Sequence, residues 1–130
     1  MSIKKNMITI AAAAAMSLSA GAVLAKTVQV TMHAKETTVK IYNKGTEYPA
    51  WTFDGTIPGP LVRVTEGDTV EFTLINDKEN KNSHAMDFHA AQVDVLGEFA
   101  PIKPGETKKW SFKANYPGIF MYHCGAMPMQ

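Results

Sequence analysis

Short stretches that alternate β-branched and polar residues, separated by glycine and proline turns, constrain the fold of this chain more than any other feature. The alternation predicts strands at residues 27–34, 37–43, 61–76, 108–114 and 118–124. The stretch 61–76 should divide at the turn Glu66-Gly67-Asp68, and a Pro-Gly pair precedes each of the last two strands. Many short strands with regular turns and no helical periodicity are typical of an all-β, Greek-key sandwich or barrel.

The first 25 residues have the pattern of a secretory signal peptide. Lys4 and Lys5 precede an apolar run, and small residues then lead to an expected cleavage position after Ala25. The apolar run is short and is broken by serine and glycine, which argues against a membrane anchor. We therefore expect residues 1–25 to be removed on export to the periplasm, and residues 26–130 to form one domain without further membrane contact.

The net charge limits the kinds of binding partner, and the cysteine content limits the possible states of Cys124. The chain has 13 basic and 12 acidic residues, so loss of Lys4 and Lys5 leaves a net charge of −1 with neutral histidines. This balance gives no indication of a nucleic-acid or anionic-membrane partner. Cys124 is the single cysteine, so no internal disulfide can form. In an oxidising compartment such a cysteine is expected to be buried, bonded to another chain or held by a metal.

Three of the four histidines occur in two tight groups. His84 and His89 lie in the segment SHAMDFHA, and His123 directly precedes Cys124 in the segment YHC. Successive side chains of a strand point to opposite faces, so each segment should contribute one residue to each of two separate sites. The fourth histidine, His33, stands alone among polar neighbours and is expected to be a solvated surface residue.

Neighbouring residues indicate which face of each segment is buried. His84 shares its parity with three apolar residues, Met86, Phe88 and Ala90. Cys124 shares its parity with two aromatic residues, Phe120 and Tyr122. His89 shares its parity with Asp87, so the favoured arrangement buries His84 with Cys124 and leaves His89 with His123 on an accessible face beside Asp87. Parity alone leaves the crossed pairing open.

A buried thiolate next to imidazoles suits copper. Two histidines and one cysteine in a trigonal plane, with a weak axial methionine, form the blue-copper electron-transfer site. An exposed pair of imidazoles could hold a second copper that binds substrate. Because His123 and Cys124 are adjacent, an electron would have a short through-bond path from the first copper to the second.

Two alternatives oppose this interpretation. Zinc is the competing metal, but a structural zinc site usually has four closed ligands and more cysteine. Without a metal, Cys124 could be a small buried hydrophobe and the histidines satisfied polar residues, since free cysteine is commonly buried. The coincidence of His-Cys adjacency, a second histidine pair, a β pattern and an export signal favours metal binding.

Other polar and methionine-containing segments give weaker signals. Met127 and Met129 in the tail could be thioether ligands, although a tail without a role is favoured. Met86 and Met121 lie within predicted strands and are expected in the core. The polar stretch NDKENKNS, residues 76–83, is expected to be an exposed loop before His84.

Three segments carry a resemblance to a known family. They are FDGTIPGPLVRVTEGDTVEFTLIN, HAMDFH and KPGETKKWSFKANYPGIFMYHC. They resemble the first cupredoxin, or plastocyanin-like, domain of copper-containing nitrite reductases and their multicopper oxidase relatives. Laccase-type oxidases would instead show His-x-His pairs and a His-Cys-His motif, so a trinuclear oxygen-reducing cluster is not expected.

The resemblance implies a role for each of five residues. His84 and Cys124 match ligands of the type 1 copper, and His89 and His123 match ligands of the catalytic type 2 copper. Asp87 matches the acid that holds nitrite or water and relays protons, which fits general acid catalysis. In the family, a small redox partner supplies an electron through the type 1 copper, and nitrite at the type 2 copper becomes nitric oxide and water in a homotrimer.

The sequence also departs from the family pattern. Family members continue after the cysteine with a second type 1 histidine, a methionine and a final strand, and then with a second cupredoxin domain, whereas this sequence stops at Gln130. We therefore expect a fragment or truncated reading frame of a longer copper oxidoreductase, whose nitrite reductase activity needs the downstream parts. The alternatives are a single-domain electron carrier without catalysis, and a copper-handling protein that uses Met127 and Met129.

Overall fold

The computed structural model describes residues 24–42 and 45–126. The expected signal peptide falls almost entirely outside the described residues, and so do Met127 and Met129. The described chain contains six strands and no helix, and therefore no helix long and apolar enough to cross a membrane. The strands are β1 (Thr27–Lys40), β2 (Glu47–Phe53), β3 (Thr69–Asn76), β4 (Asp87–Phe88), β5 (Thr107–Lys113) and β6 (Tyr122–His123).

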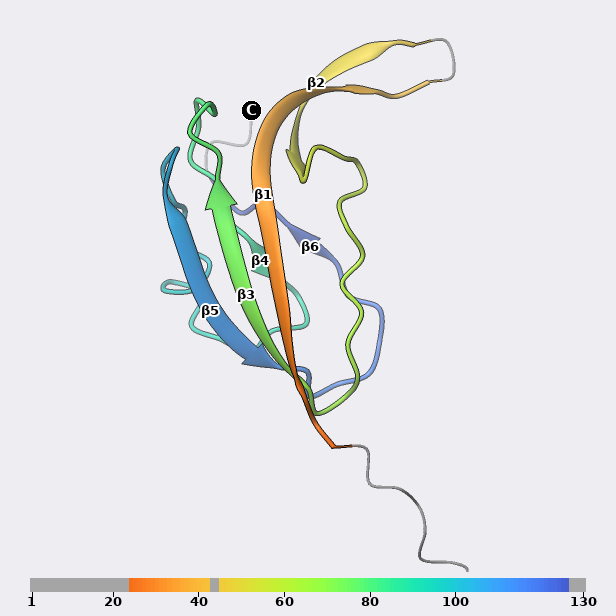
Figure 1. Ribbon diagram of the computed structural model, residues 1–130, viewed down its shortest axis with the longest axis vertical. Helices are drawn as coiled ribbons and strands as arrows, with labels where there is room; N and C mark the ends of the chain where they lie inside the picture. Colours follow the sequence, from red (N-terminus) through yellow and green to blue (C-terminus); the bar gives the residue numbers. More distant parts are fainter. Residues whose placement is uncertain (1–23, 43–44, 127–130) are drawn as a thin grey trace, which may run out of the picture.

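The strands form two sheets, and the all-β prediction is confirmed. The larger sheet has the order β2-β1-β3-β5, and the smaller sheet pairs β4 with β6. β1 runs parallel to β3 and antiparallel to β2, whereas β3 and β5 are antiparallel. The smaller sheet lies behind the larger one in Figure 1, and the hairpin of β1 and β2 extends beyond both. The smaller sheet carries most of the histidine and cysteine chemistry predicted from the sequence.

Several predicted strand boundaries were wrong. The stretches predicted at 27–34 and 37–43 are joined in one strand that ends at Lys40, because β1 exchanges its partner at Ala34, which pairs with Asn76 of β3 and with Phe53 of β2. β2 itself was not predicted; its Pro49 weakens the strand signal, but β2 is an edge strand, where a proline is tolerated.

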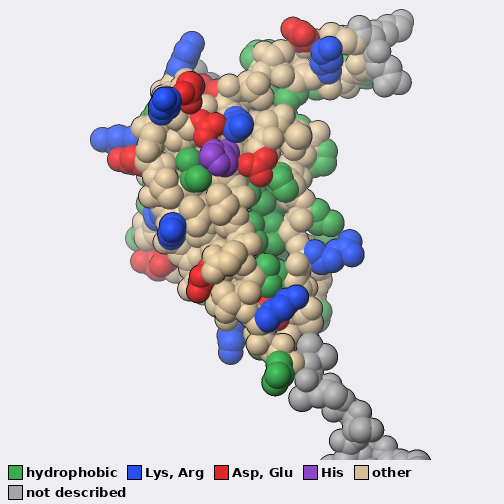
Figure 2. Space-filling view, in the orientation of Figure 1, with side chains coloured by type: hydrophobic (Ala, Val, Ile, Leu, Met, Phe, Trp, Pro, Cys, Tyr) green, Lys and Arg blue, Asp and Glu red, His purple; other side chains and the backbone are tan. Residues whose placement is uncertain are grey.

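Two further predicted strands are largely irregular. Residues 61–65 have no assigned strand, although Val62 and Val64 pack against the core. Figure 2 shows apolar side chains gathered between β1 and this part of the chain. Residues 118–121 are also irregular, so Met121 is 62% exposed rather than part of the core. Alternating apolar and polar residues indicate that one face of a segment is buried. They do not show that a neighbouring strand is present to form hydrogen bonds with its backbone.

The core lies between the two sheets. β3 contributes its alternate residues Val70, Phe72 and Leu74, which are fully buried. The ring of Phe72 meets the ring of Phe88 on β4 edge to face, with centroids 4.8 Å apart. Met86 is fully buried as predicted. Because Phe88 is fixed in this core, the side chains of its chain neighbours Asp87 and His89 are directed to the other side of the small sheet.

Asp68 secures the start of β1 and β3. Its side chain is 1% exposed and accepts hydrogen bonds from the backbone amides of Lys26 and Thr65, both at 3.0 Å. These hydrogen bonds hold the pKa of Asp68 below its ordinary value. The buried carboxylate therefore joins three segments at one end of the larger sheet.

Candidate metal centres

The loop that precedes His84 is more ordered than its composition suggests. Residues 76–83 were predicted to be exposed, but Asn76 and Asn80 are buried. The Asn80 side-chain amide donates to Ala34 O at 2.7 Å and to Asn76 Oδ1 at 2.6 Å. Asn76 in turn donates to Ile102 O at 2.9 Å. Short polar side chains can replace backbone partners, which explains why such a polar stretch can lie inside the fold.

His84 is held in the interior by its own backbone. Its amide donates to Ile102 O at 3.0 Å, and Ile102 N donates to His84 O at 2.8 Å. The imidazole is 1% exposed, and its Nδ1 lies 3.7 Å from Cys124 Sγ. The sulfur also accepts a hydrogen bond from Ala85 N at 3.5 Å.

The distance between these two donor atoms fits a shared metal ion. With metal–nitrogen and metal–sulfur distances of about 2.0 and 2.3 Å, a trigonal angle at the metal would separate nitrogen and sulfur by roughly 3.7 Å. The observed separation of Nδ1 and Sγ is 3.7 Å. One thiolate and one imidazole are soft and borderline ligands, which suit copper.

The protonation equilibria of the pair favour a thiolate. Burial raises the pKa of Cys124, but hydrogen bonds from His84 and from the Ala85 and Ala126 backbone amides outweigh it, so this pKa lies below its ordinary value. Burial lowers the pKa of His84, but its interactions with Cys124 and Glu36 outweigh it, so that pKa is raised. The thiolate is the form of cysteine that binds metals.

Two residues next to His84 were missed by the sequence analysis. Glu36 Oε1 lies 3.2 Å from His84 Nε2, on the side of the ring away from Cys124. Partial burial raises the pKa of Glu36, but hydrogen bonds led by those from Asn82 outweigh it and lower this pKa. The ring of Trp51 meets the His84 ring edge to face, with centroids 4.6 Å apart. No local pattern marks either residue, because only the folding of β1 and β2 brings them to His84.

A second group of donor atoms lies on the small sheet. Asp87 and His123 are directly opposite each other in the β4–β6 pair, and His89 N donates to Met121 O at 3.1 Å. His89 Nε2 is 2.9 Å from His123 Nε2, and Asp87 Oδ2 is 3.8 Å from His123 Nε2. One donor atom from each of the three side chains lies within 4.8 Å of the others.

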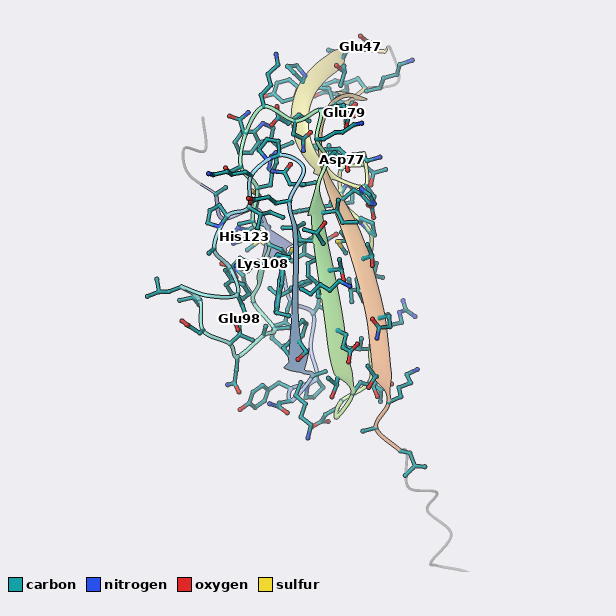
Figure 3. All side chains as sticks on the ribbon, turned by 60° about the vertical axis from the view of Figure 1, so that its left-hand side comes forward. Glu47, Asp77, Glu79, Glu98, Lys108 and His123 are labelled. Atoms are coloured by element: carbon teal, nitrogen blue, oxygen red, sulfur yellow. The ribbon has the colours of Figure 1, made fainter. Side chains whose placement is uncertain are left out.

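This second group also has a geometry that fits a metal. Two nitrogens at about 2.0–2.1 Å from one ion would be roughly 2.9 Å apart at the right angle of a tetragonal copper site, and roughly 3.3 Å apart at a tetrahedral angle. The side chains of His123 and Asp87 are 42% and 33% exposed, and His89 is exposed. Figure 3 shows His123 beside β6, on the side of the molecule away from β1. A small ligand could therefore reach these atoms from solvent.

The structure thus produces the favoured pairing and not the crossed one. His84 is buried beside Cys124, which is itself only partly buried, while His89 lies beside His123 on an accessible face with Asp87. The two groups occupy opposite sides of the peptide that joins residues 123 and 124. Their placement follows the alternation of the chain, and their roles as metal ligands stay predictions.

His33 belongs to neither group. Its side chain is 41% exposed, as expected for a surface residue, but its Nδ1 lies 2.6 Å from Asp77 Oδ1. Within the residues that the structure describes, Asp87, His89 and His123 form the one cluster of three side chains with metal-binding spacing. His33 is therefore a hydrogen-bonded surface residue rather than a freely solvated one.

Tyr122 connects the second group to the chain that follows β2. Its hydroxyl donates to Pro60 O at 2.6 Å, and its ring packs on Phe53 with centroids 5.7 Å apart. A Cβ atom at Gly59 would lie 2.5 Å from the Tyr122 hydroxyl oxygen, so the close approach requires glycine. The same residues form one wall of a groove of about 420 Å³, which Trp51 and Met121 also line.

The chain is similar to copper-containing enzymes of known family. A family model described as "Multicopper oxidase" matches residues 33–129. The chain is 45% identical over 103 residues to the copper-containing nitrite reductase of Neisseria meningitidis serogroup A, covering 78% of this chain and 26% of that protein. It is 45% identical over 100 residues to the copper-containing nitrite reductase of Alcaligenes faecalis, covering 76% and 27%. The chain therefore spans about a quarter of the length of these curated relatives.

Solved structures show the same likeness. The copper nitrite reductase from Nitrosomonas europaea has 70% sequence identity and a TM-score of 0.78, over 79% of this chain and 36% of that chain. The copper-containing nitrite reductase from Thermus scotoductus has 35% identity and a TM-score of 0.70, over 77% and 23%. The fold expected from the sequence is confirmed by these structures.

Proposed function

The chain belongs to the multicopper oxidase family, and from this premise we propose that it is a copper-binding redox domain of the copper nitrite reductase type. The observation that carries the proposal is the pair of donor groups on either side of one peptide bond. The first is the buried imidazole of His84 with the partly buried thiol of Cys124, termed the buried pair. The second is the more accessible group of Asp87, His89 and His123, termed the exposed group, and together they are the combination that such a domain needs.

The buried pair would serve electron transfer. His84 and Cys124 would hold a type 1 copper, with further ligands from outside the described residues. The buried position of His84 would keep water from this side of the site. Copper bound by His84 and Cys124 would supply one-electron transfer. Copper bound by the exposed group would supply a centre that binds anions.

The exposed group would serve substrate chemistry. His89 and His123 would hold the type 2 copper, and Asp87 is placed to hold a proton beside it, with Oδ2 3.8 Å from His123 Nε2. Reduction of nitrite to nitric oxide and water consumes one electron and two protons, so a carboxyl group next to the substrate would act as a general acid.

The remaining assignments extend beyond the described residues. We propose a periplasmic location after removal of residues 1–25, a small redox protein as electron donor, nitrite as substrate and a homotrimer as the assembly. The likeness to copper-containing nitrite reductases supports these assignments, although the chain matches only about a quarter of their length.

Copper stoichiometry tests the proposal. We would measure bound copper and the visible spectrum of the wild type, Cys124→Ser and His89→Ala. Cys124→Ser should lose the thiolate-to-copper absorption and one copper, whereas His89→Ala should lose one copper and keep that absorption. Copper binding that is unchanged in both variants would overturn the proposal.

A nitrite assay then separates the two redox functions. Nitric oxide formation that disappears in His89→Ala would support catalysis. Reversible oxidation and reduction of the wild type, unaffected by His89→Ala and without nitric oxide formation, would instead indicate an electron carrier that uses only the buried pair.

A further inference from the structure

The carboxylate of Glu36, a residue of β1, contacts both the loop before His84 and the side chain of His84. Its Oε1 accepts hydrogen bonds from Lys81 N at 3.1 Å, Asn82 N at 2.8 Å and Asn82 Nδ2 at 3.0 Å. The same oxygen lies 3.2 Å from His84 Nε2. With its side chain 18% exposed, Glu36 is largely enclosed by the groups that it binds.

The position of this carboxylate is fixed from both sides. Glu36 N donates to Asn80 Oδ1 at 2.8 Å, and Asn80 is itself buried and bonded to Ala34 O. The backbone of Glu36 is therefore held by the loop, and the loop amides are held by its side chain. An ionised carboxylate suits this position because several donors converge on one oxygen.

The orientation of the His84 ring follows from this contact. A carboxylate can only accept hydrogen bonds, so the nitrogen that faces Glu36 must carry a hydrogen. When a metal replaces the proton that His84 shares with Cys124, the neutral imidazole keeps its hydrogen on this nitrogen and presents the lone pair of the other nitrogen. That nitrogen is Nδ1, which lies 3.7 Å from Cys124 Sγ. A histidine that binds a metal through one nitrogen commonly donates from the other to a carboxylate.

We propose that Glu36 is a positioning residue of the buried site, which holds His84 so that Nδ1 faces the metal shared with Cys124. The inference rests on the proposed function, because it assumes that His84 and Cys124 share a metal. It adds a residue of β1, 48 positions away from His84, to the groups that determine metal affinity.

The test uses Co²⁺ as the probe, because Co²⁺ reports thiolate coordination without oxidising the cysteine. Titration of the full chain should give a thiolate-to-cobalt absorption band in the wild type that Cys124→Ser lacks. Glu36→Gln keeps the shape of the side chain but removes its charge, and we expect it to weaken Co²⁺ binding by about 10- to 100-fold, as for other residues that support a metal ligand.

Two matched variants separate positioning from general effects. Glu71→Gln removes one charge from an exposed position on β3 and should bind Co²⁺ as the wild type does. Asn82→Ala removes one hydrogen bond to Glu36 without removing a contact of His84, and should weaken binding much less than Glu36→Gln. A second readout is the Nε2–H signal of His84 in the Zn²⁺-loaded protein, whose exchange with solvent should become faster in Glu36→Gln.

The possible outcomes are distinguishable. A cysteine-dependent band of equal affinity in the wild type and Glu36→Gln would overturn this inference alone. Equal weakening in Glu36→Gln and Asn82→Ala, with unchanged Nε2–H exchange, would also overturn it, because the loop rather than the carboxylate would then determine affinity. The absence of a cysteine-dependent band in the wild type would overturn the proposed function and this inference together.

Discussion

A methyl group added at Gly59 tests how Tyr122, the residue before His123, is held against the chain that follows β2. The new Cβ would lie 2.5 Å from the Tyr122 hydroxyl oxygen and 3.3 Å from Phe53 Cβ. Ordinary contacts between carbon atoms are about 3.5–4.0 Å, so the hydroxyl must move away by roughly 1 Å. That movement breaks its hydrogen bond to Pro60 O.

The expected cost can be worked from these contacts. Overpacking lowers the free energy of unfolding by about 1–3 kcal/mol. This range already includes about 1 kcal/mol for the lost hydrogen bond. Alanine restricts the unfolded chain more than glycine does, which offsets about 0.4–1 kcal/mol. We therefore expect Gly59→Ala to lower the free energy of unfolding by about 1–2 kcal/mol.

A double-mutant cycle isolates the cause. Tyr122→Phe removes the clashing oxygen and leaves the ring carbon Cζ, which is 3.4 Å from the position of the new Cβ. In that background Gly59→Ala should cost less than about 0.5 kcal/mol, which gives a coupling free energy of about 0.5–2 kcal/mol. Urea unfolding followed by circular dichroism provides the four free energies. An equal cost of alanine in both backgrounds would refute the steric reasoning.

Three further predictions concern other contacts. Metal binding at His84 should quench the fluorescence of Trp51, which touches that ring; Trp51→Phe should abolish most of the quenching, and Trp110→Phe should preserve it. Asn80→Ala removes three hydrogen bonds of a buried side chain and should lower the free energy of unfolding in urea by about 2–4 kcal/mol. The lowered pKa of Asp68 means that its contribution to stability is complete above about pH 4 and is lost as the pH falls through its folded pKa, so an acid-unfolding series should be flatter for Asp68→Asn than for the wild type.

Sequence periodicity predicted the strands that have buried alternate residues and regular partners. β3 and β5 appear close to their predicted bounds, because each presents one apolar face to the core. The failures have a different cause: Pro49 weakened the signal of β2, and the covered face of residues 61–65 does not provide a backbone partner. Hydrogen-bond partners depend on the positions of distant segments, which local alternation does not report.

In the candidate sites, too, local alternation predicted some features, whereas contacts between distant segments could not be predicted. Parity correctly grouped His84 with Cys124 and His89 with His123, because these segments follow the two-residue period of a strand. Glu36 and Trp51 could not be found in this way, since they approach His84 from β1 and β2. The sequence thus indicates the candidate ligands, whereas the residues that contact them from other strands emerge only from the packing of the sheets.

The order in which the strands pair has a consequence for how the protein acquires its metal. Thr27 pairs with Thr69, and Thr69 with Lys113, so two of the three strand pairs of the large sheet join residues about forty positions apart in sequence. Such a high contact order slows folding to milliseconds or seconds, because large loops must close before these two pairs form, although the hairpin of β1 and β2 is local. The histidine and cysteine segments join this sheet from its long connections and from the end of the described chain. We therefore expect metal capture to be a late event that locks an already folded chain, and not a template on which folding begins.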